Sequence, residues 1–222
     1  MKIRVLFVGE TLTTHVMFDK GVLDFMIASR IVDDGVFLRR CLERSGFEVR
    51  HIPTLSAAAE FPENLEELRR YDVIIFSDIG SDTILLHPEV FYESKPRPNR
   101  LKLVHNYVRE SGGGFLMIGG YLSFQGLNAM ARYKGTPIEE ILPVELMPYD
   151  DRVEDPEGFN PTVTIKDHPI TSGLPDKWPT LLGYNKTNLR PGVILLAEYN
   201  GDPILAVWEV GKGRAAAFTS DC

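Results

Sequence analysis

The sequence is poor in cysteine and has no long apolar run. Its two cysteines, Cys41 and Cys222, are too few for a disulfide framework. No stretch approaches the roughly 20 apolar residues of a membrane-spanning helix. The opening apolar segment runs into Glu10 without the small-residue cleavage site of a signal peptide. These absences lead us to expect a cytoplasmic protein that does not contact a membrane.

Positive charge is also scarce. The chain has 24 lysines and arginines against 31 aspartates and glutamates, a formal net charge of −7. A nucleic-acid-binding domain would show clustered basic charge, so we expect no nucleic-acid partner. No group of His, Cys and Asp residues has the spacing of a metal-ligand set, and we expect neither a metal nor a cofactor.

Short apolar runs alternate with helical periodicity through the first half of the chain. Strands are predicted over residues 3–8, 48–52, 73–76 and 115–118, and helices over 34–46, 62–71 and 100–111. Residues 10–33 look irregular, and residues 87–100 look like an excursion over the surface. This alternation predicts an α/β fold, with a parallel sheet covered by helices on both faces.

The second half of the 222-residue chain has a different character. Residues 133–161 are rich in proline and acidic residues and are expected to form a long irregular segment. A short strand is predicted over 162–165, and an antiparallel pair over 193–199 and 204–210. A last strand is predicted over 215–219. We therefore expect one domain whose mostly parallel sheet has late antiparallel strands.

A glycine-rich turn marks the centre of the sequence. Three glycines precede the apolar strand 115–118, and Gly119 and Gly120 follow it. This is the frame of a nucleophile elbow, a sharp turn at the carboxyl end of a strand that presents a catalytic side chain. Glycine stands where such enzymes carry Cys, Ser or His.

Four stretches together resemble a known family. They are residues 71–80, 112–126, 149–153 and 211–222. With them the chain resembles the class I glutamine amidotransferase-like proteins, in a branch related to the ThuA-like proteins. The resemblance implies a flavodoxin-like three-layer sandwich over nearly the whole chain. Members of this branch usually continue past residue 222, so we expect this chain to lack a covering helix at its C-terminus.

Active members of the amidotransferase class use a cysteine at the elbow and a His-x-Glu pair near the C-terminus. Here Gly119 occupies the elbow and no His-x-Glu occurs near the C-terminus. Glutamine hydrolysis needs a thiolate, a base that activates it and a group that orients the base. We therefore expect no glutaminase activity.

Two acidic residues follow predicted strands, Glu10 the first and Asp78 the third. The carboxyl ends of parallel strands meet at one edge of a sheet, where ligands bind in open α/β folds. As a pair, the two carboxylates are suited to bind a polyol or to act as general acid and general base. As separate residues, each fits the cap of a following helix or an acceptor for a loop amide.

The elbow residues are expected at the same edge. Gly119 and Gly120 could offer backbone N–H groups to an anion, or serve only as a tight turn that needs positive φ. Tyr121 could donate a hydrogen bond to a ligand, or form an amphipathic wall. Ser123 and Gln125 are the other polar side chains nearby.

The remaining polar candidates have simpler interpretations. Histidines 15, 87, 105 and 168 are expected to be surface, turn or packing residues. The acidic residues 150, 151, 154 and 155 do not match a calcium-binding loop and suggest a solvated acidic face. Cys41 is expected in the core, and Cys222 fits a small buried residue better than a displaced nucleophile.

We expect this protein to bind a small polar ligand, sugar-like or carboxylated, at the sheet's carboxyl edge, through Glu10, Asp78, Gly119, Gly120 and Tyr121. One alternative is a hydrolase or isomerase that uses Glu10, Asp78 and Tyr121 as its catalytic residues. Another is an interaction module whose segment 133–161 forms a partner or subunit interface, and a homo-oligomer stays open.

Overall fold

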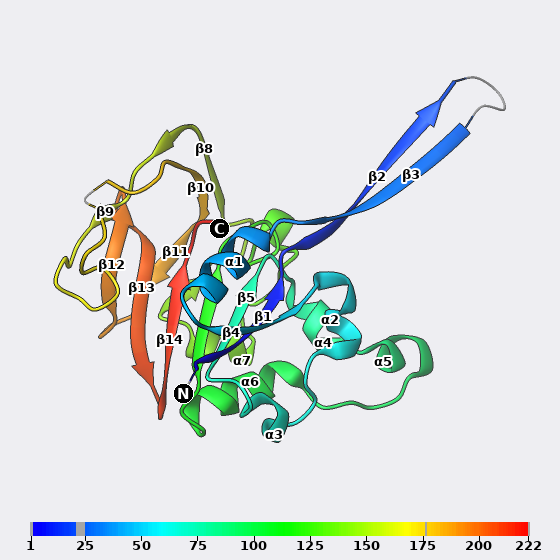
Figure 1. Cartoon of the computed structure of the whole chain (residues 1–222), viewed down its shortest axis with the longest axis horizontal. Helices are drawn as coiled ribbons and strands as arrows, with labels where there is room; N and C mark the ends of the chain where they lie inside the picture. Colours follow the sequence, from blue (N-terminus) through cyan, green and yellow to red (C-terminus); the bar gives the residue numbers. More distant parts are fainter. Residues whose placement is uncertain (1, 21–24, 176, 222) are drawn as a thin grey trace.

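The centre of the molecule is an eight-stranded sheet. It is seen in the computed structural model of the chain, which describes residues 2–20, 25–175 and 177–221. The strand order is β4-β1-β5-β6-β14-β13-β12-β9. The first five strands run parallel: β4 (Glu48–Ile52), β1 (Arg4–Gly9), β5 (Val73–Ser77), β6 (Gly114–Ile118) and β14 (Gly213–Phe218). The other three are antiparallel: β13 (Asp202–Val210), β12 (Ile194–Tyr199) and β9 (Thr162–Val163). This confirms the predicted mixed sheet and its late antiparallel strands (Figure 1).

Helices cover both faces of the parallel half, as predicted. Alternate side chains of β1 and β5 point to opposite faces, as the two-residue period of a strand requires. Leu6 and Ile74 join a core with α2 (Thr54–Glu60), α3 (Leu65–Leu68), α4 (Ser81–Leu85), α6 (Arg100–Arg109) and α7 (Pro137–Ile141). Phe7 and Ile75 pack on the other face under α1 (Val36–Arg44). None of the described helices has the length and hydropathy to cross a membrane.

The chain between the predicted helices is more ordered than expected. Helix α2 was not predicted, and α3 begins at Leu65 rather than at Pro62. The surface excursion contains a short helix, α5 (Pro88–Glu93), and its exposed residues 94–99 follow. Cys41 is exposed rather than buried, because α1 turns Leu38 and Leu42 toward the sheet and Cys41 lies beside that stripe.

The proline-rich segment 133–161 is not irregular, which corrects the sequence-based expectation. It contains α7, β7 (Val144–Leu146) and β8 (Arg152–Phe159). Strand β8 pairs with β10 (Leu181–Asn185), and β7 pairs with β11 (Thr187–Leu189). The β8–β10 ribbon packs Phe159 and Tyr184 against the antiparallel end of the sheet. This end of the sheet is therefore covered by strands instead of helices.

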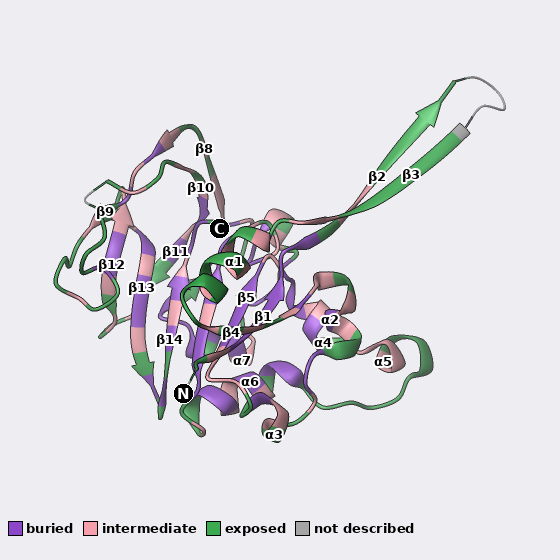
Figure 2. Ribbon diagram, in the orientation of Figure 1, coloured by how far each residue is buried: buried purple, intermediate pink, exposed green. Residues whose placement is uncertain are grey.

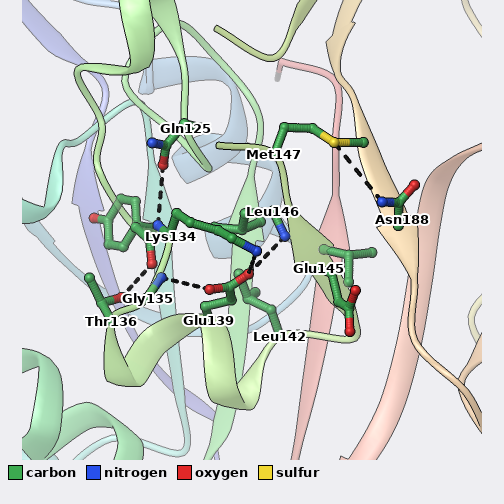
Figure 3. Close-up of polar contacts among 12 residues, drawn as sticks. Gln125, Lys134, Gly135, Thr136, Glu139, Leu142, Glu145, Leu146, Met147 and Asn188 are labelled. Carbon is green, nitrogen blue, oxygen red and sulfur yellow. Dashed lines mark hydrogen bonds and ion pairs between the residues drawn. The ribbon is translucent and has the colours of Figure 1, made fainter. Parts of the chain in front are cut away.

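A buried carboxylate holds the start of this segment in place (Figure 3). Glu139 accepts hydrogen bonds from the backbone N–H of Gly135 at 2.6 Å and of Leu146 at 2.9 Å, and from Lys134 Nζ at 3.0 Å. Burial favours its neutral form, yet these three donors hold the pKa of Glu139 below its ordinary value. Local backbone donors thus fix a segment whose prolines suggested irregular structure.

The described residues between 10 and 33 are also regular, contrary to expectation. They form a hairpin of two nine-residue strands, β2 (Thr11–Asp19) and β3 (Phe25–Asp33), which we call the arm. The arm projects away from the body of the molecule (Figure 1). The sequence hides it because apolar and polar side chains are mixed along both strands and neither strand belongs to the main sheet.

The turn from β1 to the arm leaves no room for a side chain at Gly9. Gly9 has φ +115°, and a Cβ there would lie 1.8 Å from the backbone oxygen of Ser77. We expect Gly9→Ala to lower the free energy of unfolding by about 3 kcal/mol or more, because β1 and β5 would have to separate. The matched control is Gly46→Ala, with φ +90° but nothing within 4 Å, which should cost only the backbone strain of about 1–2 kcal/mol. Urea unfolding measures both, and equal losses would contradict the steric argument.

Candidate functional site

The carboxyl ends of β1, β5 and β6 lie side by side, as predicted. Gly9 pairs with Ser77, and Ser77 pairs with Ile118. Glu10, Asp78 and the glycine elbow therefore follow three adjacent parallel strands. The structure brings these residues to one edge but gives each a different environment.

Glu10 is sealed beneath the base of the arm. Its side chain is 6% exposed, and its Oε1 accepts a 2.5 Å hydrogen bond from the hydroxyl of Ser77. The backbone oxygen of Glu10 accepts from the N–H groups of Asp34 and Gly35. A Cβ at Gly35 would lie 2.8 Å from Glu10 Cβ, so the chain packs tightly over it. Glu10 therefore joins the arm's base to β5.

Asp78 braces the elbow loop. Its Oδ1 accepts from the N–H of Leu122 at 2.6 Å, and its own N–H donates to Ser123 Oγ at 3.1 Å. This is the expected alternative in which the carboxylate accepts from a loop amide. Burial raises the pKa of Asp78, the Leu122 N–H opposes that rise, and the nearby Asp34 charge adds to it.

Both glycines of the elbow are closed to a side chain. A Cβ at Gly119 would lie 2.2 Å from the backbone oxygen of Thr219. Gly120 has φ +135°, and a Cβ there would lie 2.9 Å from Asp78 Oδ1. Their N–H groups are also engaged: Gly119 donates to backbone oxygens of β14 and of Ser220, and Gly120 donates to the side chain of Asn185. An anion at these two N–H groups would have to displace those acceptors.

A buried aspartate organises the loop after the elbow, and the sequence did not predict it. Asp151 is 1% exposed, which corrects the expectation of a solvated acidic face at this position. Its carboxylate accepts from the backbone N–H of Gln125 at 2.9 Å and of Gly126 at 2.8 Å, and from Asn185 Nδ2 at 2.8 Å. Burial raises the pKa of Asp151, while Asn185 and the two N–H donors pull it down. The available signal was the position of Asp151 in a stretch that carries the family resemblance.

A cavity of about 370 Å³ opens beside the elbow. It lies between the carboxyl ends of β6 and β14 and the β8–β10 ribbon, with Gly120, Tyr121, Arg152, Glu154, Asn185 and Asp221 among its lining residues. The guanidinium carbon of Arg152 lies 5.1 Å from the centroid of the half-exposed Tyr121 ring, a cation–π contact. Of the five predicted site residues, Gly120 and Tyr121 line this cavity.

Arg152 is held in place by Asp150. Two hydrogen bonds, of 2.9 and 2.8 Å, join the guanidinium to the two oxygens of Asp150. The Arg152 side chain holds the pKa of Asp150 below its ordinary range. This bidentate pairing fixes the plane of the guanidinium over Tyr121.

The other polar candidates take structural positions. His15 bonds Ser29 on the arm, His168 accepts from Ile170 N in its turn, and His87 caps α5. His105 contacts Glu140 and Asn106. Cys222 lies outside the described residues. Within the described chain, no group of three or more His, Cys, Asp or Glu side chains is arranged to hold a metal.

Removing the Asp151 carboxylate should destabilise the protein strongly. Asp151→Ala leaves two buried N–H groups and the Asn185 amide without their acceptor, so we expect a loss of about 3 kcal/mol or more in the free energy of unfolding. Asp150→Ala, which breaks a more exposed ion pair, should cost about 1 kcal/mol or less. Chemical denaturation of both variants at pH 7 tests this, and a comparable loss in the two would refute the role given to Asp151.

The raised pKa of Asp78 has a consequence for stability against pH. A carboxyl group whose pKa is higher in the folded than in the unfolded state loses its contribution as pH rises through the folded value. Asn stays neutral, so the stability of Asp78→Asn relative to wild type should increase from pH 4 to pH 7. Asp150→Asn should show the opposite trend between about pH 3 and pH 5, because the pKa of Asp150 is lowered and its contribution is lost as pH falls below the unfolded carboxyl value. Urea midpoints over the two pH ranges decide the matter, and trends of the same sign would contradict the assignment.

The structure is similar to two solved bacterial proteins. One is the cytoplasmic protein STM3548 from Salmonella typhimurium, 43% identical, with a TM-score of 0.93 over 98% of this chain and 87% of that one. The other is the cytoplasmic protein STM1381 from Salmonella typhimurium LT2, 41% identical, with a TM-score of 0.93 over 99% of this chain and 89% of that one.

A more distant likeness concerns the fold alone. A β-galactosidase from Rahnella sp. R3 is 18% identical, with a TM-score of 0.53 over 82% of this chain and 23% of that one. A search of curated proteins gives no match. The family model described as "Putative glutamine amidotransferase" matches residues 4–222. The chain therefore belongs to this glutamine amidotransferase-like family.

Proposed function

We propose that this amidotransferase-like protein binds a small polar ligand in the cavity beside Tyr121 and does not hydrolyse glutamine. The observation that carries the second part is the crowding at the elbow. A Cβ at Gly119 would lie 2.2 Å from the backbone oxygen of Thr219. Hydrolysis through a covalent intermediate needs a nucleophilic side chain with an activating base. The elbow lacks the thiol, and it also lacks the room for one.

The described residues do not supply the other catalytic groups in the family's pattern. No His-x-Glu pair occurs near the C-terminus, and the pair formed by His87 and Glu89 lies at the start of α5, where the His87 ring accepts from the N–H of Glu89. Cys41 is exposed on α1, the helix that covers the face of the sheet formed by Phe7 and Ile75. These observations support a protein that keeps the family's frame and uses the edge of its sheet for binding.

The lining of the cavity favours a ligand with several hydroxyl groups. Tyr121 offers an aromatic face, and Glu154 and Asp221 bring acceptors. The charge of Arg152 is already balanced by Asp150. A ring that carries hydroxyls can stack on the tyrosine and exchange hydrogen bonds with both kinds of group. A carboxylated ligand fits if it shares Arg152 with Asp150.

The geometry does not favour the rival functions. An acid–base enzyme built on Glu10, Asp78 and Tyr121 needs these groups around one substrate. Glu10 is buried against Ser77, and neither carboxylate lines the cavity that Tyr121 borders. Segment 133–161 is folded into the protein's own body, with 12 of its 29 residues buried, so its structure does not require a partner.

We also propose a cytoplasmic location. Both Salmonella proteins that resemble this chain carry the word cytoplasmic in their names. The low cysteine content of the sequence, two residues, fits the same location, because disulfide-rich proteins belong to oxidising compartments.

Ligand binding can be tested by thermal stabilisation with a panel of monosaccharides, sugar acids and glutamine. We expect at least one hydroxylated compound to raise Tm, by mass action on the folded state. Tyr121→Ala should weaken that ligand about tenfold, as loss of one aromatic contact would. Tyr92→Ala is the matched control, since Tyr92 is 80% exposed on α5 and does not line the cavity. Equal effects of the two substitutions, or glutamate release from glutamine above an enzyme-free blank, would overturn the proposal.

A further inference from the structure

The arm extends beyond the body of the molecule, which leaves most of its described residues uncovered. Every described residue from His15 to Lys20 and from Met26 to Ile31 is exposed (Figure 2). The arm's described strands carry seven exposed large apolar side chains: Leu12, Val16, Met17, Phe18, Met26, Ile27 and Ile31. A two-stranded ribbon is at best marginally stable alone in water. Exposed apolar surface of this kind marks an interaction site.

The two faces of the arm differ. Residues in register share a face, and the face alternates along each strand. One face carries four rows of cross-strand pairs: Leu12 with Val32, Thr14 with Arg30, Val16 with Ala28, and Phe18 with Met26. Six of these eight residues are apolar, and we call this set of eight the apolar face. The opposite face is partly apolar too, with Met17, Ile27 and Ile31 on either side of the polar pair His15 and Ser29. The apolar face differs in having an apolar pair at each of its two ends, Leu12 with Val32 and Phe18 with Met26.

We propose that the arm is a dimerisation device: the apolar faces of two copies of this chain pack on each other across a two-fold axis, with the arms antiparallel. The two-fold axis lies in the plane of contact and runs perpendicular to the strands, so each strand packs over the same strand of the partner. With four rows, it places Leu12 over the partner's Phe18 and Val32 over the partner's Met26. The two inner rows then face each other.

The inner rows are complementary in size and polarity. Arg30 comes to lie over the partner's Ala28, the smallest side chain of the apolar face. The apolar stem of Arg30 can cover that alanine while its guanidinium reaches water at the open edge of β3. Thr14 lies over the partner's Val16. One face therefore supplies both halves of the contact, which is what an isologous two-fold interface requires.

The area of the apolar face is large enough for a second copy of the chain to bind, and it predicts the affinity of the dimer. Leu12, Val16 and Phe18 are each 43–44% exposed, and Met26 is 57% exposed. Eight side chains of this kind present roughly 500 Å² per copy, so two faces bury about 1,000 Å². That is the lower limit for a specific interface. The dimer should therefore dissociate in a measurable concentration range, with a Kd on the order of micromolar.

The proposal is tested by sedimentation velocity of the full chain over about 1–100 µM. Wild type should pass from monomer to dimer as concentration rises. Val16→Lys with Met26→Lys, both on the apolar face, should weaken the dimer at least tenfold. The matched control, Met17→Lys with Ile27→Lys, adds the same charge to the same two strands on the opposite face and should dimerise like wild type. Because these positions lie far from the core, all variants should keep the thermal transition of wild type.

A second pair of variants tests the register. Ala28→Arg would bring a guanidinium against the partner's Arg30 and should weaken the dimer at least tenfold, whereas Ser29→Arg, on the opposite face, should not. Wild type that stays monomeric throughout would overturn the proposal. So would equal effects of the two lysine variants, which would indicate pairing of the strand edges instead. A dimer that tolerates Ala28→Arg would overturn the antiparallel register.

Discussion

The carboxylate of Asp151 is the interaction on which the candidate site depends. It joins three parts of the chain that are far apart in sequence: the start of β8, the loop after the elbow and the end of β10. Asn185 extends this connection, because its amide bonds both the N–H and the carbonyl oxygen of Gly120. The β8–β10 ribbon is therefore tied to the carboxyl edge of the sheet, and the space left between them is the cavity. A buried carboxylate is stable there only because backbone N–H groups and an amide replace its water.

The elbow has the geometry of a catalytic frame, with glycine at the position of the nucleophile. Gly119 is pressed between strands, with its N–H shared by the oxygens of Phe218 and Ser220. Gly120 adopts a positive φ, against Asp78. Restoring a nucleophile would thus require movement of β14 or of Asp78, more than a single substitution. Polar groups line the cavity beside the end of β6, around Tyr121 and Arg152.

Much of the fold could be predicted from the sequence, and less of the site. Continuous apolar runs bounded by glycine and proline gave the parallel strands, and the elbow gave the carboxyl edge of the sheet, where Gly120 and Tyr121 line the cavity. Asp151 and Asn185 were missed because their importance comes from contacts across about 25 to 65 residues of chain, which no local pattern encodes. Segment 133–161 was misjudged because its order comes from a buried glutamate and from pairing with residues 181–189. The arm was missed because its strands belong to no larger sheet.

The place where the arm joins the body has a consequence for the history and the engineering of this chain. The arm leaves at Glu10 and returns at Asp34, and the N–H of Asp34 donates to the oxygen of Glu10 at 3.0 Å. The two junctions are therefore already as close as the ends of a tight turn. An insertion with such closed ends can be gained, shortened or exchanged by recombination without rerouting the strands on either side. The same stem is a natural grafting point, where a foreign hairpin or reporter could be mounted on an otherwise unaltered α/β scaffold.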